Sequence, residues 1–182
     1  MRDFKSKKYK CFIFDYYGTL FNPNAASENI FFDGIPDLIK QVSENNLCAI
    51  ATRTPLSIIK EHLKKAELFD CFASIKSTEL AHDKPDPYVL NEILCELDID
   101  PKHALMIGDN ISDLAFGFNA NVDSVLVDFT GFSDFSSSSR SYNPSESILS
   151  ESILSESILK EVKKYSSYPV ITSVSDLREL II

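Results

Sequence analysis

The sequence feature that most restricts the fold is a set of short apolar runs that alternate with helix-like segments. Each run is continuous rather than alternately apolar and polar, as expected for strands covered on both faces. The main runs occupy residues 10–14, 47–51, 71–75, 104–107 and 124–127, and a shorter one at 169–171, which contains a proline, suits an edge strand. Apolar residues at helical spacing occur between and after them, at 35–45, 55–66, 87–97, 112–119 and 175–181. The alternation predicts an α/β fold with a doubly wound parallel sheet.

The chain length and one unusual segment define the expected domain organisation. With 182 residues, the chain suits a single domain, 1–182, interrupted by a low-complexity insertion at about 132–168. The insertion contains three tandem copies of SESIL at 145–159. A period of five residues matches neither a helix nor a strand, so we expect a surface connection. The apolar pattern resumes after it, which predicts an insertion rather than a tail.

Charge and composition restrict the partners. The formal net charge is −9, which opposes general binding to nucleic acid or to an anionic membrane surface. No apolar run approaches the roughly 18 residues of a membrane span. The four cysteines form no CxxC pair and are expected to be buried, reduced thiols. These features predict a cytoplasmic protein.

Polar residues occur where the predicted strands end or the helices begin. They are Asp15, Thr52, Lys84, Asp109 and Asp113, with Gly18 and Gly108 nearby. Each alone has an ordinary structural explanation, such as a turn, a helix cap or a solvated charge. Open parallel sheets, however, bind ligands at the carboxyl ends of their strands, and glycine there allows close approach of the backbone. Together the residues suit phosphate chemistry at one sheet edge.

Each of these residue types has a place in that chemistry. A carboxylate such as Asp15 can attack phosphorus, while Thr52 and Lys84 can bind the phosphoryl oxygens. Asp15 and Asp109 can share Mg²⁺, a hard cation that takes oxygen ligands. Asp113 can hold either that metal shell or Lys84 in place.

These residues also resemble the ordered motifs of a known family. Asp15-Tyr-Tyr-Gly-Thr-Leu20, Thr52, Lys84-Pro-Asp-Pro87 and Gly108-Asp-Asn-Ile-Ser-Asp113 are similar to the four motifs of the haloacid dehalogenase superfamily. Within it, the chain most resembles the phosphoglycolate phosphatase-like hydrolases, which have a Rossmann-like fold. The resemblance covers about residues 10–131 and 169–181.

The resemblance implies a role for each site residue. Asp15 would be the nucleophile that becomes phosphorylated, and Asp15, Asp109 and the backbone carbonyl of Tyr17 would bind Mg²⁺, with Asp113 beside them. Thr52 and Lys84 would hold the phosphoryl group, and Gly18 lies in the same phosphate-binding loop. Tyr17 stands at the catalytic acid–base position.

Two departures from the family pattern bear on activity. Tyr17 replaces the aspartate that serves as general acid and base in the phosphatases, and a tyrosine is too weak an acid to shuttle protons well near neutral pH. Neither the segment from Asp15 to Thr52 nor that from Thr52 to Lys84 has room for a cap domain. The resemblance therefore predicts a domain without a cap, with reduced activity where a leaving group must be protonated.

Three functions remain open at this stage. The first is a Mg²⁺-dependent phosphatase acting on a small or macromolecular phosphorylated substrate. The second is a haloacid dehalogenase-type hydrolase, because Asp15-Tyr-Tyr-Gly-Thr-Leu20 also resembles the first motif of true dehalogenases, in which halide leaves without a proton. The third is a catalytically weakened domain that binds a phosphorylated ligand.

Overall fold

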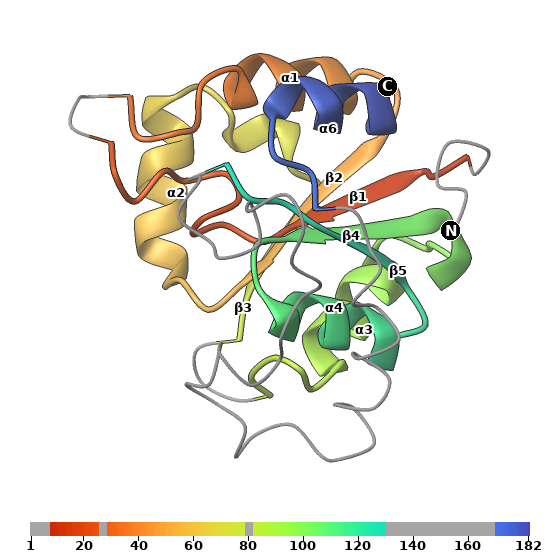
Figure 1. The fold of residues 1–182 in the computed structure, drawn as a ribbon. Helices are drawn as coiled ribbons and strands as arrows, with labels where there is room; N and C mark the ends of the chain where they lie inside the picture. Colours follow the sequence, from red (N-terminus) through yellow and green to blue (C-terminus); the bar gives the residue numbers. More distant parts are fainter. Residues whose placement is uncertain (1–7, 26–28, 79–81, 130–169) are drawn as a thin grey trace, which may run out of the picture.

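A parallel sheet of five strands forms the centre of the structure (Figure 1), a computed structural model that describes residues 8–25, 29–78, 82–129 and 170–182. All four strand pairings are parallel, and the order across the sheet is β3-β2-β1-β4-β5. The strands are β1 (Cys11–Phe14), β2 (Leu47–Thr52), β3 (Ser74–Ser77), β4 (Ala104–Gly108) and β5 (Asp123–Leu126). The predicted doubly wound α/β fold is confirmed.

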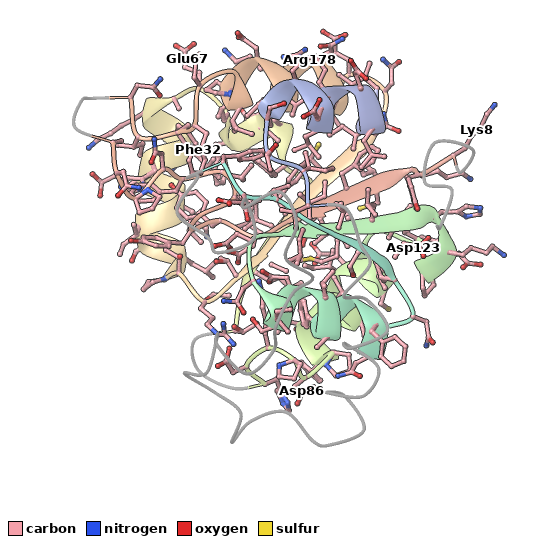
Figure 2. All side chains as sticks on the ribbon, in the orientation of Figure 1. Lys8, Phe32, Glu67, Asp86, Asp123 and Arg178 are labelled. Atoms are coloured by element: carbon pink, nitrogen blue, oxygen red, sulfur yellow. The ribbon has the colours of Figure 1, made fainter. Side chains whose placement is uncertain are left out.

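Helices cover both faces of the sheet (Figure 1). The helices α1 (Ile35–Ser43), α2 (Leu56–Lys65) and α6 (Val174–Ile181) pack on one face, and α3 (Tyr88–Glu96) and α4 (Ile111–Asn119) pack on the other. Two short 3₁₀ turns, η1 (Phe69–Cys71) and η2 (Pro101–His103), precede β3 and β4. Side chains fill the space between the sheet and each helix layer (Figure 2).

The strand β1 illustrates why its apolar run is continuous. Phe12 and Phe14 belong to the core under α1, α2 and α6, whereas Cys11 and Ile13 belong to the core under α3 and α4. Successive side chains of a strand point to opposite faces, so a strand buried on both faces needs an apolar residue at every position.

The structure corrects the third predicted strand. The strand was expected at 71–75, but β3 is Ser74–Ser77, and Cys71 ends the 3₁₀ turn η1. Phe72, which follows that turn, is buried in the core. The apolar residues at the start of this run therefore pack from a turn, and apolarity alone did not distinguish that turn from a strand.

The segment predicted as an edge strand at 169–171 makes one bridge. Ile171 pairs in parallel with Val127, beyond the end of β5. The Ile171 amide donates to the carbonyl of Leu126, and the Asp128 amide donates to the carbonyl of Ile171. The chain after residue 169 thus returns to the sheet edge before entering α6, whereas the predicted insertion at 132–168 lies outside the described residues.

Further expectations concern the membrane and the cysteines. None of the helices in the described ranges combines the length and apolarity that crossing a membrane requires. Cys11 and Cys48 are buried free thiols, and burial raises the pKa of each to about 12. Cys71 is half-buried and Cys95 is exposed, so the expected burial of the cysteines is wrong for Cys95.

The order of the strands determines where a site can form. From β1 the chain proceeds outward through β2 to β3, then returns to the opposite side of β1 with β4 and β5. The connections diverge beyond the carboxyl ends of β1 and β4, and open parallel sheets bind their ligands at such a point.

Candidate active site

The five predicted polar residues lie at this edge of the sheet, at the end of a strand, in the connections after strands or at the start of a helix. Asp15 directly follows β1, and its amide donates to the carbonyl of Ile107 in β4 at 2.8 Å. Thr52 is the last residue of β2, Lys84 lies between β3 and α3, Asp109 directly follows β4 and Asp113 lies in the first turn of α4.

Lys84 joins two of the carboxylates. Its Nζ donates to Asp15 Oδ1 and to Asp113 Oδ1, both at 2.7 Å. The Lys84 side chain is 1% exposed, and its ammonium lies 5.4 Å from the centre of the Phe116 ring, a favourable cation–π arrangement. Burial by itself would lower the pKa of Lys84, but the carboxylates of Asp113 and Asp15 raise it above its ordinary value. Lys84 is therefore a cation fixed in the interior.

Asp113 links this ion pair to the start of α4. Its Oδ2 accepts a hydrogen bond from the Asn110 amide at 3.1 Å, and the Asn110 side chain accepts one from the amide of Ser112. This reciprocal arrangement is a capping box, which satisfies amides at the first turn of the helix. Asp113 thus stabilises the helix with one oxygen and positions Lys84 with the other.

The glycines Gly18 and Gly108 allow the carboxylates to approach the backbone. A Cβ atom at Gly18 would lie 2.3 Å from Asp109 Oδ2, and one at Gly108 would lie 2.3 Å from Asp113 Cγ. Gly18 also has φ +81°, a left-handed conformation that favours glycine. Each glycine thus leaves the space that one aspartate occupies.

Three carboxylates at this edge form a group suited to a cation. Asp15, Asp109 and Asp113 each offer an oxygen, and these oxygens lie within 4.8 Å of one another. Desolvation and the neighbouring charges of Asp113 and Asp15 raise the pKa of Asp109 to about 7. Burial likewise raises the pKa of Asp15, against the lowering effect of Lys84. Carboxylate oxygens are the ligands that Mg²⁺ prefers, so the residues present fit this ion.

Thr52 completes the set around Asp15. The residue is buried, and hydrogen bonding to Thr52 acts to lower the pKa of Asp15. Thr52 Oγ1 also accepts a hydrogen bond from the Thr54 amide at 3.2 Å. The hydroxyl is therefore fixed beside the carboxylate.

Tyr17 has its side chain at the surface. It is 56% exposed, and its ring stacks on Phe21 with the ring centres 5.4 Å apart. No pattern in the sequence indicated this contact between residues 17 and 21.

Arg53 is a charged residue at this edge that the sequence analysis did not single out. It directly follows Thr52, and its guanidinium donates to Asp83 Oδ1 at 2.6 Å and to the carbonyl of Lys84 at 2.8 Å. A third, longer bond of 3.3 Å reaches Ser112 in α4. Arg53 therefore connects three of the loops that carry the site. Its position next to Thr52 was the available signal in the sequence.

The chain matches a family model and curated relatives. Residues 2–127 match the model of the haloacid dehalogenase-like hydrolases. A phosphoglycolate phosphatase of Psychrobacter arcticus is 28% identical over 137 residues, covering 74% of this chain and 57% of the relative. The pyrophosphatase PpaX of Bacillus cereus is 31% identical over 99 residues, covering 54% and 45%. The chain thus spans about half the length of the curated relatives it matches.

A solved structure of similar extent supports the fold. The haloacid dehalogenase superfamily hydrolase of Ehrlichia chaffeensis aligns with a TM-score of 0.63, covering 96% of this chain and 97% of that one at 16% identity. At this identity the similarity concerns the fold alone.

Proposed function

The chain belongs to the haloacid dehalogenase-like hydrolases, and we propose that it is a phosphatase that depends on Mg²⁺ and forms an aspartyl-phosphate on Asp15. The observation that carries the proposal is the arrangement of Asp15, with Lys84 on one carboxylate oxygen and Asp109 within metal-sharing distance. A phosphatase of this kind needs a nucleophile, a cation for the phosphoryl oxygens and a metal-binding carboxylate.

The chemistry assigned to this chain has two displacement steps. A carboxylate oxygen of Asp15 attacks phosphorus, the bond from phosphorus to the leaving oxygen breaks, and the leaving group takes the bonding electrons. Water then attacks the phosphorus of the aspartyl-phosphate, which restores the Asp15 carboxylate and releases inorganic phosphate. Thr52 and Lys84 bind the phosphoryl oxygens in both steps, and Gly18 lets its loop approach them closely.

The metal proposal uses the acidic group at the same edge. Asp15, Asp109 and the backbone carbonyl of Tyr17 would hold Mg²⁺, with Asp113 close by. When bound, the ion would neutralise phosphoryl charge. Asp113 would also keep Lys84 directed at Asp15 through the 2.7 Å contact that it makes.

Tyr17 influences which phosphates can be hydrolysed. Loss of a positioned general acid typically slows a reaction by about 10²–10⁴-fold. An acyl or aryl phosphate escapes this penalty, because its leaving group departs as a stable anion. We therefore expect acyl and aryl phosphates to be hydrolysed much faster than alkyl phosphates.

The site is proposed to lack a cap domain. The helical elements among the described residues between β1 and β3 are α1, α2 and the 3₁₀ turn η1. The proposal therefore includes a site that is open to small or macromolecular substrates.

Specific observations bear on the two alternative functions, a dehalogenase-type hydrolase and a domain that binds a phosphorylated ligand. Asp15 and Tyr17 together favour a dehalogenase-type hydrolase, but the grouping of Asp109 with Asp15 and Asp113 favours metal-dependent chemistry instead. The exposed side chain of Tyr17 favours a weakened domain that binds a phosphorylated ligand without turnover.

A substrate panel with and without Mg²⁺ tests these functions. The panel contains acetyl phosphate, 4-nitrophenyl phosphate, glycerol phosphate and a 2-haloacid, each tested with the parent and with Asp15→Asn. The phosphatase proposal expects Mg²⁺-dependent phosphate release that Asp15→Asn abolishes. Halide release without Mg²⁺ would support dehalogenation, and absence of turnover with ligand-induced stabilisation would support the binding domain. Phosphate release that survives in Asp15→Asn would contradict the assigned nucleophile.

A further inference from the structure

An aromatic stack begins at Tyr17, two residues after the nucleophile, and its rings have no role in the mechanism above. The ring of Tyr17 stacks on Phe21, and Phe21 stacks on His62 of α2 with centres 5.6 Å apart and an interplanar angle of 7°. The His62 ring is held in place by a contact with the core, because its Nδ1 is 2.8 Å from the hydroxyl of the buried Tyr16. We name the rings of Tyr17, Phe21 and His62 the aromatic platform.

The backbone holds the platform close to the reacting group. Tyr17 is two residues after Asp15, so their Cα atoms are at most about 7 Å apart. The Gly18 amide donates to the carbonyl of Phe21 at 2.9 Å, which closes the loop that carries both rings. The same Gly18 lies against the carboxylate of Asp109. The loop that carries Tyr17 is therefore in contact with the proposed metal site.

The platform combines solvent exposure with apolar character. Tyr17 is the most exposed aromatic residue among the large hydrophobic residues of the described chain, at 56%. Ile58, which is 43% exposed, lies one helical turn before His62 on α2 and extends the apolar surface. Contiguous exposed apolar patches are typical of interaction sites and ligand contacts.

The nature of the platform and the missing acid indicate the same ligand. An aromatic ring stacks favourably on another in an offset arrangement, and such pairs contribute beyond the area they bury. A phenolate is also a leaving group that needs no proton, which suits a site with Tyr17 at the acid position. A flat, apolar leaving group that departs as an anion satisfies both conditions.

We propose that the aromatic platform binds the aryl group of an aryl phosphate while its phosphoryl group lies at Asp15, so that Tyr17 determines substrate specificity rather than donating a proton. The inference rests on the proposed phosphatase function, which it extends to a substrate class. Its chemistry is shared by small aryl phosphates and by phosphotyrosine in a peptide.

Binding of two matched phosphonates separates stacking from reactivity. Benzylphosphonate and cyclohexylmethylphosphonate carry the same anionic group and rings of similar size, but only the first is aromatic, and neither is hydrolysed. Their dissociation constants are measured by calorimetry with Mg²⁺ for the parent, Tyr17→Leu and Tyr17→Phe. Tyr88→Leu is the control, because Tyr88 is another exposed aromatic residue, on α3, and stacks on His82.

We expect the parent, Tyr17→Phe and Tyr88→Leu to bind benzylphosphonate roughly 2- to 12-fold more tightly than its saturated counterpart. In Tyr17→Leu the ratio is expected to approach one. A ratio near one in the parent, or a preference that Tyr17→Leu retains, would overturn the proposal. Melting temperatures of all four proteins verify that each variant is folded.

Turnover distinguishes failure of this inference from failure of the phosphatase proposal. Phenyl phosphate and a phosphotyrosyl peptide are compared as substrates of the parent and Tyr17→Leu, and the faster one identifies the source of the aryl group. Mg²⁺-dependent turnover that does not respond to Tyr17→Leu would refute the platform and leave the phosphatase standing. Absence of turnover, with the Tyr17-dependent phosphonate preference intact, would support the platform as a binding site and refute the phosphatase.

Discussion

Replacement of Lys84 by methionine tests the buried charge arrangement most directly. Lys84→Met keeps a long apolar side chain but removes the ammonium, which leaves Asp15 and Asp113 without their common partner. The side chains of these aspartates are 11% and 3% exposed, so water compensates little. Removal of one partner from a buried ion pair typically costs 3–5 kcal/mol, and we expect Lys84→Met to lose about that amount of unfolding free energy.

The measurement is urea unfolding followed by far-ultraviolet circular dichroism at pH 7.5 in EDTA. Lys76→Met provides the matched control, because Lys76 forms a 2.8 Å ion pair with Glu96 at the surface, with the side chains 29% and 47% exposed. Surface pairs of this kind contribute about 0–1 kcal/mol, so this variant should remain close to the parent.

A double variant identifies the source of the loss. The double variant, Lys84→Met with Asp113→Asn, removes one of the two carboxylates that Lys84→Met leaves without a cationic partner. We expect it to recover part of the stability lost in Lys84→Met. A loss for Lys84→Met no larger than that for Lys76→Met would refute the argument that Lys84 is a structural cation. Equal stability of the single and double variants would refute the assignment of the loss to unpaired carboxylates.

Three further predictions concern the acidic group and its glycines. Asp109→Asn should abolish the rise in melting temperature that Mg²⁺ induces in the parent, measured by differential scanning fluorimetry; an unchanged rise would place the metal elsewhere. Folding raises the pKa of Asp109 from 3.8 to about 7, so the folded state binds this proton more tightly than the unfolded state does. Without Mg²⁺, the unfolding free energy should therefore fall as pH rises from about 4 to 7, and it should fall less steeply in Asp109→Asn. Parallel profiles for the parent and the variant would contradict the assignment. Gly18→Ala should weaken Mg²⁺ binding much more than Gly34→Ala does. Both glycines have φ near +80°, but a Cβ at Gly34 meets nothing closer than 3.4 Å. Calorimetric titration with Mg²⁺ compares the two variants, and equal affinities would contradict a role for close approach at Gly18.

The sheet and the identity of the polar residues were predictable because both leave strong local signals. A strand buried on two faces must be apolar at each position, as in β1, and the residues that follow such strands in a parallel sheet meet at one edge. The placement of Asp15, Thr52 and Asp109 at that edge follows from this rule, and Lys84 and Asp113 lie in the connection or helix that follows a strand.

Other features depended on contacts between distant residues and were not predictable. The start of β3 was misplaced because Phe72 packs into the core from a turn. The stack of Phe21 on His62 joins residues from separate elements, and nothing in the sequence near either residue indicates it. The role of Arg53 as a link between loops also required the positions of Asp83 and Ser112.

The fit between Gly108 and Asp113 restricts the evolutionary routes open to this chain. The fit excludes a side chain at position 108, because any Cβ there would lie 2.3 Å from Asp113 Cγ. Asp113 would have to move, and it could not do so without releasing Lys84 and the first turn of α4. Replacement of Gly108 therefore requires an accompanying change at position 113, and a variant with the single change at 108 is expected to be selected against for stability before any new activity arises.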